Sequence, residues 1–138
     1  MDHAGTNYLA VLVAAFAGFA VGALWYGVLG RQWMRAAGLA EVDLKGRGRD
    51  PVPFVVAGIA DLVMAFVLAG AIGHLGQGQV TPFNGVVSGA ILWAGMVATT
   101  IAVNNAFAMR RPMLTVIDAG HWLAVLVTMG LVIGLFGV

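Results

Sequence analysis

Four long apolar stretches dominate the sequence, at about residues 8–29, 53–75, 83–107 and 113–138. A bilayer core about 30 Å thick is crossed by a helix of about 20 apolar residues. A segment within lipid must also satisfy its own backbone hydrogen bonds, as a helix does. The sequence therefore predicts an all-α membrane protein with four transmembrane helices, in a single domain over residues 1–138.

The amino-acid composition also indicates that this chain is surrounded by lipid. Hydrophobic residues make up 61% of the chain and charged residues 9%, whereas a soluble domain carries about 25% charged residues. So apolar a chain cannot cover itself with polar surface in water, and the lipid bilayer is its expected partner. With no cysteine, disulfides, thiolate metal sites and thioether-linked haem are excluded. We expect no nucleic-acid partner.

Basic residues follow the first and third apolar stretches only. They are Arg31, Arg35, Lys45, Arg47, Arg49, Arg110 and Arg111. Lysine and arginine are retained on the cytoplasmic side during insertion. The pattern predicts a multi-pass protein of the bacterial inner membrane with both termini outside and a cytoplasmic loop over residues 30–52. Residues 31–40 of this loop are expected to form a short separate helix in the interface, with Trp33 facing lipid and Gly38 at its end.

Glycines recur four residues apart inside the apolar stretches. The pairs are Gly18 and Gly22, Gly85 and Gly89, and Gly130 and Gly134. Such spacing lets membrane helices approach closely. Four helices enclose little volume, and these glycine faces exceed what one bundle needs. We therefore predict a homo-oligomer, with a dimer as the simplest form, and leave open an unidentified membrane partner.

Three ionisable residues lie well inside the predicted helices, namely Asp61, Asp118 and His121. A charged Asp at mid-membrane costs about 2.5–3.5 kcal/mol on insertion scales, so these side chains should face the bundle interior. Asp118 and His121 are three residues apart on one helix and can touch.

The predicted topology places further polar and aromatic side chains in the same cytoplasmic half of the membrane. The candidate binding residues are Asp61, Asp118, His121, Asn104, Asn105, Thr100, Tyr26 and Trp25. We expect them to form one polar layer.

Three functions fit such a layer. It can lock the helix register of a structural or accessory protein, or bind a small solute. The alternative is a small transporter or channel-like protein that moves a polar solute, a cation or a proton. No nucleophile elbow, zincin motif or phosphate loop is present, so we expect no enzyme, no cofactor and no catalytic residue. No short His/Asp cluster fixes a metal geometry, so no metal site is expected.

A weak internal repeat is also present. The sequence Gly-Ala-Leu-Trp at 22–25 is similar to Gly-Ala-Ile-Leu-Trp at 89–93, and an Asp follows early in the next apolar stretch each time, at Asp61 and Asp118. The repeat suggests two parallel helical hairpins around an axis along the membrane normal.

Six short segments carry a family resemblance. They lie at residues 7–15, 22–26, 33–39, 61–65, 98–100 (with Asn104) and 117–120, the last reading Ile-Asp-Ala-Gly. Together they resemble the bacterial integral membrane family catalogued as domain of unknown function 1761. The resemblance implies a four-helix membrane protein and implies no reaction, substrate or catalytic residue.

Overall fold

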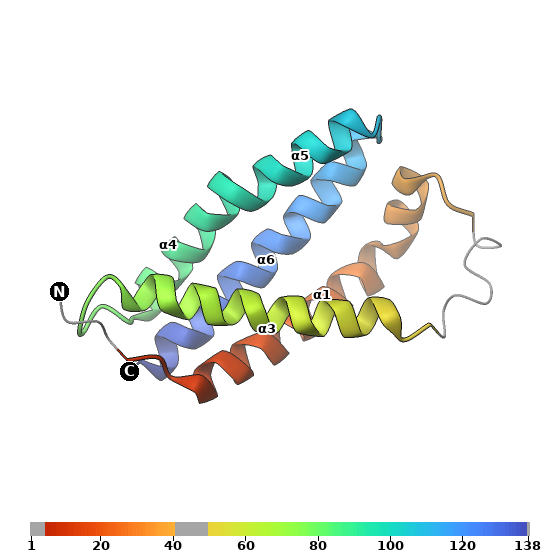
Figure 1. Cartoon of the computed structure of the whole chain (residues 1–138). Coiled ribbons are helices and arrows are strands. Elements are labelled where there is room, and N and C mark those ends of the chain that lie inside the picture. The colour runs from red at the N-terminus through yellow and green to blue at the C-terminus, as the bar shows by residue number, and fades with distance from the viewer. Residues whose placement is uncertain (1–4, 41–49, 138) are drawn as a thin grey trace.

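The computed structural model describes residues 5–40 and 50–137, and these residues form four antiparallel helical spans (Figure 1). The elements are α1 (Tyr8–Ala37), α3 (Val52–Gly73), α4 (Pro82–Leu92), the π-helical turn η1 (Trp93–Val97), α5 (Ala98–Phe107) and α6 (Pro112–Phe136). The third span is Pro82–Phe107, in which α4, η1 and α5 follow one another. Each of the four spans is long and apolar enough to cross a membrane, which confirms the predicted all-α architecture. The basic residues Lys45, Arg47 and Arg49 and the last residue of the predicted fourth span lie outside the described residues.

The first helix is longer than its apolar stretch. It begins where the Asn7 side chain accepts a hydrogen bond from the Ala10 N–H (3.0 Å) and ends at Gly38, which has a left-handed φ of 72°. The prediction of a separate helix over residues 31–40 was therefore wrong, although Gly38 does end the helix. The helix continues because Ala36 and the partly buried Trp33 pack with Leu114 of α6.

Helix α6 is the centre of the bundle. It packs along α1 on one side and along α4 on the other, and it also touches α3 and α5. The contact with α4 is a backbone contact, because a Cβ added to Gly85 would lie 1.9 Å from the Gly130 carbonyl oxygen. Gly89 faces the Leu126 backbone in the same way.

The predicted glycine pairs thus make helix–helix contacts within one chain. Gly18 and Gly22 of α1 face Met129 and His121 of α6, and Gly134 faces the Thr81 backbone. These glycines close helix crossings of a single bundle, so they do not argue for an oligomer.

The bundle is tight at one end and spread at the other. The start of α1, the end of α6 and the 74–81 connection lie at one end, which we call the terminal end; residues 38–40, 50–51 and 108–111 lie at the other, the loop end (Figure 1). The main core lies toward the terminal end and includes Ala14, Leu68, Ile72, Val125 and Met129. Toward the loop end α3 and α5 diverge (Figure 1). No residue of η1 or α5 is buried.

The two predicted hairpins are α1 with α3, and the third span with α6. They are not packed equivalently, because α6 packs along α1 as well as along α4, whereas α3 has only a small contact with α4.

The backbone contact between α4 and α6 generates a prediction. Gly85→Ala should lower the free energy of unfolding by about 1–3 kcal/mol, because one added methyl group overpacks the crossing. Gly58→Ala is the matched control, since nothing lies within 4 Å of its added Cβ. It should be neutral or slightly stabilising, as Ala favours helix by about 0.8–1.0 kcal/mol over Gly. Thermal unfolding in detergent, followed by tryptophan fluorescence, measures both. Equal melting of the two variants would contradict the close crossing.

Candidate functional site

Residues 117–120 of α6, which we call the docking segment, hold two neighbouring helices in place. The indole N–H of Trp25 in α1 donates to the Ile117 carbonyl oxygen (3.1 Å). From the other side, the indole N–H of Trp93 in η1 donates to the Ala119 carbonyl oxygen (2.7 Å). Gly120 makes room for the first ring, because a Cβ there would lie 2.9 Å from Trp25 Cζ2.

These two tryptophans end the two copies of the internal repeat. Both copies therefore dock on the same helix, α6. Two equivalent hairpins would instead have the first copy docked on α3 and the second copy docked on α6. The repeat reflects a shared way of packing a glycine and tryptophan face against α6.

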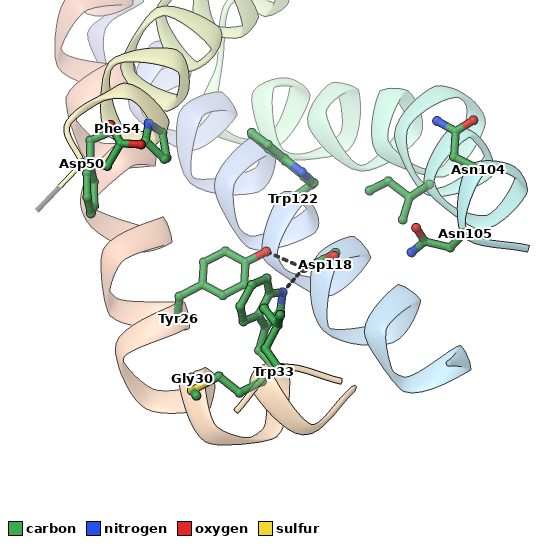
Figure 2. A pocket seen from close by; sticks show the side chains of 13 residues that line it. Tyr26, Gly30, Trp33, Asp50, Phe54, Asn104, Asn105, Asp118 and Trp122 are labelled. Atoms are coloured by element: carbon green, nitrogen blue, oxygen red, sulfur yellow. Dashed lines mark hydrogen bonds between the residues drawn. The ribbon is translucent and has the colours of Figure 1, made fainter. Parts of the chain in front are cut away.

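Asp118, in the docking segment, is hydrogen-bonded to two side chains of α1. Its Oδ1 atom accepts hydrogen bonds from the Tyr26 hydroxyl (2.7 Å) and from the Trp33 indole N–H (3.1 Å) (Figure 2). Trp33 thus faces a carboxylate, and its predicted lipid-facing position was wrong. Tyr26 and Trp33 are seven residues apart, two helical turns, so their common face could have been found from spacing.

The predicted contact between Asp118 and His121 is absent from the hydrogen bonds of the described residues. Side chains of a helix lean toward its N-terminus, and for α6 this is the loop end, where Tyr26 and Trp33 meet the Asp118 carboxylate. His121 instead packs on Gly22, where an added Cβ would lie 2.8 Å from Nε2. Its ring centroid lies 4.8 Å from that of Tyr26 and 4.5 Å from that of Trp122.

Two adjoining cavities surround these side chains. The outer cavity, about 1160 Å³, lies between α1, the start of α3, α5 and α6. Figure 2 shows Asn104 and Asn105 on its α5 side, Tyr26 on its α1 side and Asp118 between them.

The inner pocket, about 620 Å³, lies between α1, α3 and α6 and contains Asp61 and His121. It shares four wall residues with the outer cavity, namely Tyr26, Pro53, Phe54 and Trp122.

Asp61 and His121 are the buried ionisable side chains of the described residues, with exposed fractions of 4% and 8%. No described residue hydrogen-bonds the Asp61 carboxyl group. The Nδ1 atom of His121 is buried and has no hydrogen-bond partner among the described residues. The remaining lining of the inner pocket is apolar or aromatic. The pocket therefore combines one carboxyl group and one imidazole with unused hydrogen-bonding capacity.

The other predicted site residues divide between the cavities and the scaffold. Asn104 and Asn105 line the outer cavity, and Asn105 also donates to the Thr115 hydroxyl (3.1 Å). Thr100 is exposed and donates to the Met96 carbonyl oxygen of its own helix. Trp25 anchors the docking segment and lines neither cavity. The predicted residues thus divide between two adjoining cavities, with Tyr26 lining both and with Trp25 and Thr100 lining neither.

Four aromatic lining residues were not among the predicted site residues: Phe19, Trp33, Phe54 and Trp122. Phe54 carries no sequence signal, because its position depends on how α3 crosses α1. Within the described residues, no three His, Asp, Glu or Cys side chains converge as metal ligands.

Comparison with known proteins finds one family. The family described as "Protein of unknown function (DUF1761)" matches residues 9–134, which confirms the resemblance seen in the sequence. No curated protein and no solved structure matches. Because the match includes the greater part of all four spans, with the docking segment and both cavities, the chain belongs to the DUF1761 family.

Proposed function

We propose that this protein binds a small solute in the inner pocket, with Asp61 and His121 as the polar groups that contact it. The observation that carries the proposal is the contrast between two carboxyl groups. Asp118 has two hydrogen-bond donors, whereas the more deeply buried Asp61 has none from the described residues. Buried polar groups are normally paired. An unpaired carboxyl group beside a pocket is what a ligand site provides.

The size of the pocket supports the same proposal. Small-molecule sites usually enclose about 300–1,000 Å³ and combine an apolar lining with few polar groups. The inner pocket, at about 620 Å³, has this character. In this proposal Asp118 has a structural role, because its hydrogen bonds hold α1 on α6. We assign the site to binding because one carboxyl group and one imidazole in an otherwise apolar and aromatic lining are the few polar groups that a ligand site combines.

A specific observation favours transport as a second candidate. The outer cavity and the inner pocket share a wall of only four residues. Rotation of the Phe54 or Trp122 side chain would join them into one path from the loop end to the middle of the bundle. Tyr26, in the same wall, is held by Asp118. A small transporter would move a polar solute, a cation or a proton along this path.

We also propose that the loop end faces the cytoplasm of a bacterial inner membrane, with both termini outside. The support is the distribution of charge, since the described basic residues lie at the loop end and Arg111 donates to the Arg35 carbonyl oxygen there (2.6 Å). Basic residues near span ends favour the cytoplasmic side.

We further propose a homodimer in which a second copy covers α5. Asn104 and Thr100 are exposed on this span, although the span is apolar overall. An asparagine side chain within a membrane usually finds a partner on another helix. No described residue hydrogen-bonds the Asn104 side chain. The second copy would pair this amide and complete the α5 wall of the outer cavity.

The binding proposal predicts a selective effect of Asp61→Asn. A panel of amines, amino acids and sugars is screened by thermal shift on protein in nanodiscs. A solute that stabilises the natural chain should lose its effect on Asp61→Asn and keep it on Asp50→Asn. Asp50 is an exposed carboxylate before the start of the same helix, and it lines the outer cavity but not the inner pocket. If the solute is transported, its uptake into proteoliposomes should stop in Asp61→Asn.

Asp118→Ala provides the scaffold comparison. It should lower the unfolding temperature even without solute, because an unpaired buried donor costs about 1–3 kcal/mol. The binding proposal is lost if no solute stabilises the natural chain, or if Asp61→Asn responds as the natural chain does.

The topology proposal predicts opposite labelling of two single cysteines, which the cysteine-free chain makes possible. Gln77→Cys lies at the terminal end, and Met109→Cys, at a residue with 90% exposure, lies at the loop end. A membrane-impermeant maleimide applied to intact spheroplasts should label only Gln77→Cys, and permeabilised cells should label both. Labelling of Met109→Cys in intact spheroplasts would contradict the proposal that the loop end faces the cytoplasm.

The dimer proposal predicts that Asn104→Leu dissociates the protein. Native mass spectrometry from nanodiscs should give a dimer for the natural chain and a monomer for the variant, because the interhelical amide bonds are lost. Phe16→Leu, on α1 and 78% exposed, lies away from α5, is the control and should stay dimeric. A natural chain that is monomeric in the same membrane would remove the proposal.

A further inference from the structure

We infer that the ligand of the inner pocket is a hydrophobic organic monocation, such as a substituted amine or a quaternary ammonium or phosphonium ion, and that it enters from the lipid between α1 and α3. The inference rests on the proposed function and specifies the chemistry that the same pocket recognises. Charge, aromatic lining and access each contribute to it.

The charges of the pocket favour a cation. Asp61 is the one carboxyl group among the residues that line it, and no lysine or arginine of the described residues lines it. The described arginines lie at the loop end or in the last turns of α1, outside this pocket. An ionised carboxylate held away from water and from basic side chains attracts a positive ligand more strongly than it would in water. A bound cation would therefore supply the charge partner that Asp61 lacks.

The rest of the lining favours an organic cation over a metal ion. Calcium and magnesium take six or more oxygen ligands, whereas the inner pocket offers one carboxyl group. Four aromatic residues line it instead, namely Phe19, Tyr26, Phe54 and Trp122. Aromatic faces attract organic cations, and quaternary ammonium groups are recognised in this way. The small residues Ala57 and Ala60 leave space for apolar substituents.

Access favours a ligand that dissolves in lipid. Ala23, Phe54 and Val56 line the pocket and are exposed, so the pocket opens at the surface formed by α1 and α3. This surface belongs to two spans that are apolar enough to lie in a membrane. The pocket therefore borders the acyl chains, and a cation with apolar substituents can reach it by partitioning into the bilayer first.

Tetraphenylphosphonium and tetraphenylborate provide the test, because they have nearly the same shape and opposite charge. Binding of each to the full chain in nanodiscs is measured by equilibrium dialysis, with empty nanodiscs subtracted. Saturable binding is expected for the phosphonium only. Asp61→Asn should weaken it at least tenfold, and Asp50→Asn should leave it unchanged.

Ala57→Leu keeps the carboxylate and reduces the space, and it should also abolish phosphonium binding. It serves as the second variant if Asp61→Asn does not fold. Tetramethylammonium, a cation without large apolar groups, should compete poorly.

The outcomes separate the inference from the proposed function. Equal phosphonium binding by Asp61→Asn and the natural chain, or saturable binding of the borate to the same pocket, overturns the cation inference. If the phosphonium does not bind while a neutral or zwitterionic solute stabilises the natural chain through Asp61, the ligand class is wrong and the binding function stands. If no probe binds and Asp61→Asn changes only stability, both the cation inference and the proposed binding function are wrong.

Discussion

The docking of two tryptophan N–H groups on the backbone of α6 is the interaction on which the arrangement of this bundle depends. Helices in lipid gain little from apolar burial, since lipid is as apolar as their own side chains, so they associate through close packing and hydrogen bonds. Here Trp25 and Trp93 donate to the carbonyl oxygens of Ile117 and Ala119, and glycines bring α4 into backbone contact with α6. These contacts define α6 as the helix against which α1 and the third span are positioned.

The same segment explains why two aspartates with similar sequence settings differ in role. Asp118 lies between the two docked carbonyl groups, so the arrival of α1 brings Tyr26 and Trp33 to its carboxylate. Asp61 lies on α3, which packs on α1 and touches α6 only lightly, and no docked tryptophan reaches it. The Asp61 side chain is therefore buried without a hydrogen-bond partner from the part of the chain that the structure describes. The loose packing of α3 leaves the inner pocket beside this carboxyl group and gives the bundle a site as well as a scaffold.

The sequence was sufficient to predict the four spans and the family. The spans could be predicted because the bilayer sets their length and hydropathy, whatever the tertiary packing. It also marked Asp61, Asp118 and His121, since an ionisable residue in an apolar helix is conspicuous. It could not divide them into a paired group and an unpaired group, because that depends on the crossing of α1 and α3. The extent of α1 was missed for a related reason: Arg31 and Arg35 end the apolar stretch, but the helix continues to Ala37 because Trp33 and Ala36 pack on α6.

The π-helical turn connects the docking of the third span with the outer cavity. In η1 the Ala98 N–H donates to the Trp93 carbonyl oxygen five residues back, which inserts extra chain into the span at the residue that docks on α6. Such turns interrupt the α-helical register. Before the turn, Gly85 and Gly89 pack against α6; after it, α5 diverges from α3, and Asn104 and Asn105 line the outer cavity. A regular helix through residues 93–97 would rotate these amides to another face. The separation of a tight terminal end from a hollow loop end therefore originates at the tryptophan that anchors the span.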